Sequence, residues 1–240
     1  MKAARIAVLC AALAATGRAG EAVPARVLDL SGWKLTLPVD TDRPGRPDEI
    51  GTAALQSFSA PDFFFVNAAG DGVVLRAPCG GATTKGSRFP RCELREMTPG
   101  GADETAWSTD DAAPHVMEAR LAVTRTPAKK PHVVCAQIHD AEDDLLMIRL
   151  EGRRLIVERN DVGDVELDRG IELGRPFDLR IEAGGGRVGV WYNGVRKLDW
   201  KVSRAGCYFK AGCYTQSNPS KGDEPDACGE VVIPRLKVAP

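Results

Sequence analysis

The stretch "RVGVWYNGVRKLDWKV", residues 187–202, decides the fold class. Two runs rich in β-branched and aromatic residues flank Asn193-Gly194, and a type I′ hairpin turn needs the positive φ that these two residues tolerate best. Similar short runs, separated by turns such as "NDVGD" and "AGGGR", follow one another from Trp33 onward: "RLIVERN", "FDLRIEA" and "EVVIPRLKV". Only "TAALQSFSAPDFFFV" is expected to hold a short helix. The sequence therefore predicts an all-β protein, an antiparallel β-sandwich or β-jelly roll.

The beginning of the chain has the layout of a secretory signal peptide. Lys2 and Arg5 precede an apolar run over residues 6–15, which is too short to span a bilayer. Small residues follow at Gly17, Ala19, Gly20 and Ala22. We expect residues 1–22 to be removed by cleavage at about 19–22 and the protein to be secreted to the extracellular space. The remaining residues, 23–240, fit one domain with a substantial core.

Charge and hydropathy limit the partners. Loss of the basic residues Lys2, Arg5 and Arg18 by cleavage before Glu21 takes the formal charge from −1 to −4. A mildly acidic protein is not a general polyanion binder, so we expect no nucleic-acid partner, and an anionic substrate has to be held by a local basic cluster. No later segment has the length and apolarity of a transmembrane helix, so no membrane partner is expected.

Six cysteines remain after export: Cys79, Cys92, Cys135, Cys207, Cys213 and Cys228. An even number in an oxidising compartment favours disulfides, although six cysteines allow fifteen pairings. Cys79 and Cys92 flank the Gly-rich turn "CGGATTKGSRFPRC" and are predicted to form one bridge. Cys228 is expected to pair with Cys207 or Cys213, and Cys135, inside an apolar strand, to be free. Without a C-x-x-C pair or a His-rich cluster, structural zinc is not expected.

Three strand-like segments divide their side chains between two faces. Successive side chains of a strand point to opposite faces, so alternate residues share a surface. In "YFKAGCYTQ", residues 208–216, the long polar side chains all fall on even positions, and the odd positions are mostly apolar. "RCELRE", residues 91–96, and "VVCAQIHD", residues 133–140, behave in the same way. The expected polar face comprises Arg91, Glu93, Arg95, Gln137, His139, Tyr208, Lys210, Tyr214 and Gln216.

If these strands are neighbours in one sheet, they form a basic, amide-rich patch with a histidine and two tyrosines, which is a candidate site. Taken singly, each segment has a simpler explanation. Arg91, Glu93 and Arg95 are read as an exposed ion-pair ladder, His139 as a satisfied structural histidine, and the tyrosines as half-buried sheet aromatics. The joint occurrence of the three segments favours the site.

"RCELRE", "QIH" and "YFKAGCYTQ" resemble the three signature segments of the alginate lyases of polysaccharide lyase family 7, and "WKLTLPV", residues 33–39, resembles that family's opening strand. The resemblance extends from about Trp33 to the last strand. It implies a β-jelly roll whose concave sheet forms a polysaccharide groove. Cys92 replaces the usual Ser or Thr, Cys213 a small or aliphatic residue, and Thr215 a frequent Asn.

The resemblance implies an enzyme that cleaves 1,4-glycosidic bonds of alginate by β-elimination and leaves 4,5-unsaturated uronate ends. By the same resemblance Arg91 and Gln137 neutralise the substrate carboxylate, while His139 and Tyr214 supply the base and the acid. Residues expected to bind sugar or to orient this group are Glu93, Arg95, Lys210, Gln216 and Tyr208. The scheme requires no metal and no cofactor. By the same resemblance, the isoleucine in "QIH" implies activity on guluronate or mixed blocks.

Three alternatives remain at this stage. A lyase for another polyuronate, such as polyglucuronate, meets the same C5 proton and carboxylate. A glycoside hydrolase requires two carboxyl groups about 5 to 9.5 Å apart, whereas the candidate face offers Glu93 as its clear carboxylate. A non-catalytic carbohydrate-binding β-sandwich requires no histidine beside a tyrosine and an arginine. For the enzyme we expect an anionic polysaccharide, alginate, as the binding partner. We expect the protein itself to be a monomer.

Overall fold

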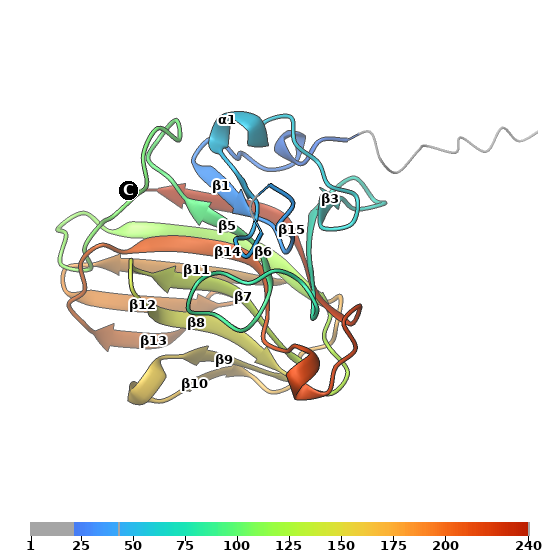
Figure 1. Cartoon of the computed structure of the whole chain (residues 1–240). Helices are drawn as coiled ribbons and strands as arrows, with labels where there is room; N and C mark the ends of the chain where they lie inside the picture. Colours follow the sequence, from blue (N-terminus) through green and yellow to red (C-terminus); the bar gives the residue numbers. More distant parts are fainter. Residues whose placement is uncertain (1–21, 43, 240) are drawn as a thin grey trace, which may run out of the picture.

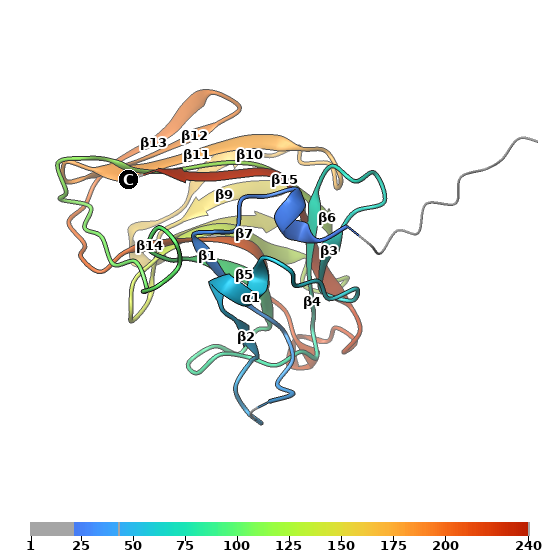
Figure 2. The ribbon, with the colours of Figure 1, turned by 90° about the horizontal axis from the view of Figure 1, so that it is seen from above.

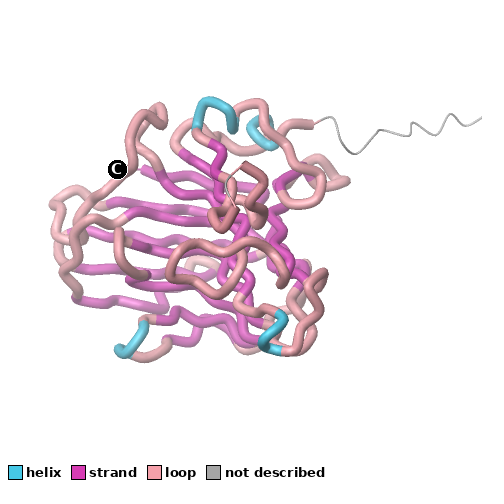
Figure 3. Tube along the Cα trace, viewed as in Figure 1, coloured by secondary structure: helices cyan, strands magenta, loops and turns pink. Residues whose placement is uncertain are grey.

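The computed structural model describes residues 22–42 and 44–239. The predicted signal peptide therefore lies, except for its last residue, outside the described residues. Two antiparallel sheets lie one over the other, as Figure 1 and the view from above in Figure 2 show, and Figure 3 shows how little helix accompanies them. This confirms the predicted all-β sandwich. Within the described ranges no helix has the length and apolarity needed to cross a membrane.

The front sheet has eight strands. Their spatial order is β10 (Val165–Asp168), β9 (Arg154–Glu158), β8 (Asp144–Glu151), β7 (His132–His139), β14 (Tyr208–Thr215), β5 (Arg91–Glu96), β1 (Trp33–Thr36) and β2 (Glu49–Ile50). The three segments singled out in the sequence are β7, β14 and β5, and they are adjacent at the centre of the sheet. The condition on which the candidate site depends is therefore met.

The back sheet has seven strands, in the order β13 (Val195–Lys201), β12 (Arg187–Tyr192), β11 (Phe177–Gly184), β6 (His115–Arg125), β15 (Cys228–Ala239), β4 (Val73–Pro78) and β3 (Phe64–Val66). The described residues contain one α-helix, α1 (Thr52–Leu55), where the sequence predicted it. Three short 3-10 helices, which the sequence did not predict, are η1 (Pro24–Arg26), η2 (Asn160–Val162) and η3 (Pro219–Lys221).

The core fills the space between the sheets, because alternate residues of each strand point inward. Leu94 and Phe209 from the front sheet and Val231 and Ile181 from the back sheet are buried in one continuous apolar cluster. These inward residues occupy the apolar parity positions of the predicted strands. The polar positions of β5, β7 and β14 are thereby turned to the outer surface of the front sheet.

Two backbone positions depend on residues that tolerate positive φ. Asn193 and Gly194 have φ of 48° and 79°, which confirms the predicted hairpin turn between β12 and β13. In β14, Gly212 has φ of 148°, and a Cβ there would lie 2.6 Å from the carbonyl oxygen of Cys92. The pairing of β14 with β7 shifts register between Ala211 and Tyr214. Gly212 thus permits the irregularity that sets the position of Tyr214.

None of the predicted disulfides is formed, since all six described cysteines are free and buried. Cys79 follows β4 in the back sheet, whereas Cys92 belongs to β5 in the front sheet, where it lies directly opposite Cys213 of β14. The loop between Cys79 and Cys92 therefore connects two layers and does not fold back on itself. The backbone of Cys228 pairs with that of Pro78 in the back sheet, and the backbone of Cys207 forms an isolated β-bridge with Trp107. Cys135 is free, as expected.

Candidate active site

Glu93 is the centre of a buried polar cluster on the front sheet. Its side chain is 0% exposed. One carboxylate oxygen accepts the amide N–H of Gln137 at 2.5 Å. The other lies 2.5 Å from Nζ of Lys210 and 3.4 Å from Nη1 of Arg91. A single carboxylate therefore fixes one residue from each of β5, β7 and β14.

The cluster carries one excess positive charge. Burial alone would raise the pKa of Glu93, but the charges of Lys210 and Arg91 outweigh it and lower that pKa. Burial lowers the pKa of Lys210 to about 8, against the attraction of Glu93. At pH 7 the cluster consists of one carboxylate, one ammonium and one guanidinium. This surplus charge suits a site for an anionic group.

The exposed ion-pair ladder predicted from "RCELRE" alone does not form. Glu93 is buried and shared with Lys210, while Arg95 turns away from it. Nη2 of Arg95 lies 3.1 Å from Glu104, and the guanidinium carbon lies 3.8 Å from the ring centre of Tyr208. Arg91 and Glu93 of β5 therefore pair inside the buried cluster, whereas Arg95 pairs with Glu104 outside it.

His139 is oriented by its neighbours. Its Nδ1 lies 2.6 Å from the carbonyl oxygen of Asp140, and because a carbonyl only accepts, Nδ1 carries the proton. Nε2 then presents a lone pair. The Tyr208 ring stacks on the imidazole at 5.6 Å, with its hydroxyl 3.2 Å from Nδ1. Burial, followed by the charge of Lys210, lowers the pKa of His139, so the imidazole is neutral at pH 7 and able to accept a proton.

Tyr214 lies against Arg91, which is opposite it in the β5–β14 ladder. The guanidinium carbon of Arg91 is 3.9 Å from the Tyr214 ring centre, a cation–π contact. Nε of Arg91 is buried and has no hydrogen-bond partner among the described residues. The Tyr214 hydroxyl lies 3.0 Å from Oγ of Ser87. A phenol and an incompletely paired guanidinium therefore share one end of the cluster.

The strand register orders these groups along the face. His139 is opposite Tyr208, Gln137 is opposite Lys210, and Tyr214 is further along β14, opposite Arg91. The Glu93 cluster thus lies between the imidazole and the phenol. The candidate base and the candidate acid occupy its two ends.

Gln216, just after β14, contacts strand β8. Its amide nitrogen lies 3.9 Å from the sulfur of Met147 in β8. Lys34 belongs to the same face although the sequence analysis missed it. Lys34 is opposite Arg95 in the β1–β5 ladder and is 2.9 Å from Glu104. The alternation of apolar and polar residues in "WKLTLPV" could have placed Lys34 on the polar face.

Ser87 was also missed. It lies in the Gly-rich loop that sequence analysis considered only for a disulfide, 127 residues before its partner Tyr214. Its signal was weak, because a serine in a Gly-rich turn is commonplace.

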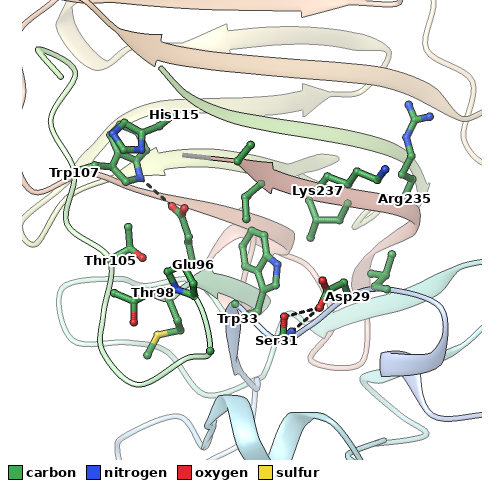
Figure 4. Close-up of a pocket in the computed structure, with 18 of the residues that line it drawn as sticks. Asp29, Ser31, Trp33, Glu96, Thr98, Thr105, Trp107, His115, Arg235 and Lys237 are labelled. Carbon is green, nitrogen blue, oxygen red and sulfur yellow. Dashed lines mark hydrogen bonds between the residues drawn. The ribbon is translucent and has the colours of Figure 1, made fainter. Parts of the chain in front are cut away.

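A cavity of about 750 Å³ lies elsewhere, beside β1 and the end of β15, and Figure 4 shows its lining. Glu96 accepts N–H bonds from Trp107 at 3.0 Å and from the backbone of Phe209 at 2.8 Å, and burial raises the pKa of this carboxyl. His115 stacks on Trp107 with ring centres 4.7 Å apart. None of the residues predicted to be catalytic lines this cavity, so its lining belongs to the support of the fold and not to the candidate site.

Two sequence comparisons agree with this geometry. A family model described as alginate lyase matches residues 28–240. An alginate lyase of Klebsiella pneumoniae is 30% identical over 275 residues, which covers 86% of this chain and 89% of the relative.

Solved structures give the same result. Alginate lyase AlgAT5 from polysaccharide lyase family 7 has a TM-score of 0.87 and 49% identity, with 91% of this chain and 98% of that chain covered. The alginate lyase from Corynebacterium sp. has a TM-score of 0.85 and 40% identity, with 90% and 97% covered. These relatives have the jelly-roll architecture predicted from the sequence. With its matching sequence over nearly the whole described length, this chain belongs to the alginate lyase family of polysaccharide lyases.

Proposed function

We propose that this alginate lyase cleaves its polymer by β-elimination at the Glu93 cluster, with His139 and Tyr214 as the proton-transferring groups. One observation carries the proposal. A buried carboxylate holds an arginine and an amide between a neutral imidazole and a phenol, all on one sheet face. Proton abstraction beside a carboxylate needs this combination of residue types.

The first requirement is to neutralise the uronate carboxylate, whose charge opposes formation of a carbanion at C5. Arg91 contributes its positive charge, and its Nε is a donor without a hydrogen-bond partner among the described residues. Gln137 has two amide N–H donors, and Glu93 takes one of them. With Lys210 adding positive charge nearby, these donors would stabilise the enolate-like intermediate as charge moves onto the carboxylate oxygens.

The second requirement is a base for the C5 proton. Nε2 of His139 is the favoured group, because the bond from Nδ1–H to the Asp140 carbonyl leaves Nε2 unprotonated. Burial lowers the His139 pKa, which keeps this nitrogen available at neutral pH. The depressed pKa also lets the imidazolium lose its proton readily after each turnover.

The third requirement is an acid that protonates O4 as the C4–O4 bond breaks. Tyr214 fills this role, since its hydroxyl is held at the opposite end of the cluster from His139. The electron pair of the C5–H bond becomes the C4=C5 double bond. The two uronate epimers differ in the face on which C5–H lies. For the epimer whose C5–H faces Tyr214, this residue acts as base from its phenolate form, takes the C5 proton and passes the same proton to O4.

For the substrate we favour guluronate or mixed blocks. The support is the isoleucine of "QIH", which in the family resemblance accompanies such activity. Ile138 is buried in the core between the sheets, so its influence on substrate choice passes through the packing beneath Gln137 and His139. We also propose that the enzyme is secreted after loss of residues 1–22 and acts as a monomer. N-terminal sequencing of the exported protein and size-exclusion chromatography test these two points.

The decisive experiment incubates the enzyme with alginate, polyguluronate, polymannuronate and polyglucuronate and follows the ultraviolet absorbance of the C4=C5 bond. Tyr214→Phe is expected to bind alginate normally and to lose about 10²–10⁴-fold in kcat, the usual contribution of a proton-transferring group. Tyr192→Phe is the matched control, because Tyr192 bonds to Asp168 in a distant part of the sandwich. Undiminished turnover by Tyr214→Phe would remove this tyrosine from the mechanism. Absorbance with polyglucuronate alone would reassign the substrate.

A further inference from the structure

The loop between β4 and β5 brings a hydroxyl group to Tyr214. In Figure 1 this loop runs in front of the front sheet, and Ser87, near its end, lies 3.0 Å from the Tyr214 hydroxyl. Because Ser87 and Tyr214 are 127 residues apart in the sequence, only the tertiary fold brings them into contact. Its chemistry is that of two hydroxyl groups, either of which can donate.

The loop is anchored on both sides of Ser87. The Ser87 N–H donates to the carbonyl of Thr84 at 3.0 Å, and the amide of Asn218 donates to the carbonyl of Arg88 at 2.8 Å. The ring of Phe89 lies 4.8 Å below Nζ of Lys130. These contacts tie the loop to its own turn, to the segment after β14 and to the segment before β7. Ser87 is therefore held in position before substrate arrives.

Hydrogen-bond accounting limits what Ser87 can do. The Phe89 N–H lies 3.1 Å from Ser87 Oγ, and because it can only donate, Oγ accepts it. The single hydroxyl hydrogen of Ser87 then has two acceptors within reach, the carbonyl of Phe89 at 3.1 Å and the hydroxyl oxygen of Tyr214 at 3.0 Å. Rotation about one bond moves the hydrogen between them without displacing any heavy atom.

We propose that Ser87 is a positioning residue for Tyr214, a role that rests on the proposed function of Tyr214 as proton donor. When Ser87 donates to the phenol oxygen, the phenol's own hydrogen is directed away from the loop and toward the substrate. As the Tyr214 O–H bond breaks, the O4–H bond forms and the C4–O4 bond is lost. Ser87 keeps its hydrogen throughout and bonds to the phenolate that results, a charge-assisted bond stronger than the one to the neutral phenol.

A simpler account is that Ser87 only closes its turn through Phe89, as serines often do. The two accounts differ in kinetics. A turn residue would affect loop stability and substrate binding. A residue that acts through Tyr214 would affect kcat only while the Tyr214 hydroxyl is present.

The experiment compares Ser87→Thr with Ser87→Val on alginate, since these two side chains have the same shape and differ in the hydroxyl. Any disturbance of the loop by branching is shared by both variants. We expect Ser87→Val to have a kcat about 10–100-fold below that of Ser87→Thr, with KM within about twofold, as for loss of a hydrogen bond to a charged group. In the Tyr214→Phe background the two substitutions should give the same residual rate.

Equal kcat for the Thr and Val variants would overturn the role of Ser87. The same holds if the ratio of their kcat values is as large in the Tyr214→Phe background as in the wild-type background. Ser203→Ala, which removes an exposed hydroxyl bonded to Asp110, is the control and should leave kcat unchanged. Failure of the proposed function has a different signature. In that case wild-type enzyme gives no unsaturated product, or Tyr214→Phe retains full activity, whichever residue occupies position 87.

Discussion

Replacement of Glu93 by Gln tests whether one carboxylate holds the active face together. The substitution leaves shape almost unchanged and removes the negative charge. Lys210 and Arg91, 7% and 6% exposed, would then face each other without a counter-charge. The new amide nitrogen would also meet a donor, either Gln137 or Lys210, where the carboxylate accepted from both.

The expected loss is large. Breaking a buried ion pair by removing one partner costs about 3–5 kcal/mol. In a domain of 150–250 residues each kcal/mol shifts Tm by about 2–4 °C, so Tm should fall by about 6–20 °C. The measurements are thermal and urea unfolding at pH 7. Glu166→Gln is the matched control, because Glu166 pairs with Arg169 at the surface, and its Tm should stay close to that of wild type.

The pH dependence sharpens the test. In the folded wild type burial lowers the pKa of Lys210 to about 8, below its unfolded value of 10.5. Between these values the unfolded chain binds more protons, so stability rises with pH. Without Glu93 the pKa of Lys210 falls further, so the pH range in which stability rises with pH begins below pH 8. Glu93→Gln should therefore recover about 1 kcal/mol relative to wild type between pH 7 and pH 8. A loss under about 1 kcal/mol that does not vary with pH would refute the reasoning.

Three other predictions concern single residues. Burial lowers the His139 pKa, so kcat/KM on alginate should fall with acid only below pH 6.5, and an acid limb centred above 6.5 would contradict His139 as base. Burial raises the Glu96 pKa, so the folded protein keeps a proton that the unfolded chain loses and stability falls as pH rises above 4.5. Glu96→Gln should thus be more stable relative to wild type at pH 7 than at pH 5 in urea titrations, and an equal difference at both would reject this account. Gly194→Ala should cost about 1–2 kcal/mol in the same titrations, because residue 194 has φ of 79°, and an unchanged midpoint would show that the turn relaxes.

Several features follow from local pattern. The turn at Asn193-Gly194 and the alternation within the strands are set by backbone sterics over a few residues, so the sequence predicted the all-β class and the face on which each polar residue lies. The resemblance to the family motifs added the expected role of each polar residue in the reaction. The predicted Cys79–Cys92 disulfide is not formed. The spacing of the two cysteines along the chain does not reveal that Cys79 follows a strand of the back sheet while Cys92 lies in the front sheet.

What the amino-acid sequence determined by itself is the parity of each strand, which is a local steric property with a period of two. Only the tertiary structure decided which strands are neighbours and in what register. Lys210 meets Glu93, and Ser87 meets Tyr214, through pairings between residues more than 100 positions apart. Such contacts depend on closing long loops and on packing two whole sheets, and neither leaves a signature in a short stretch of sequence.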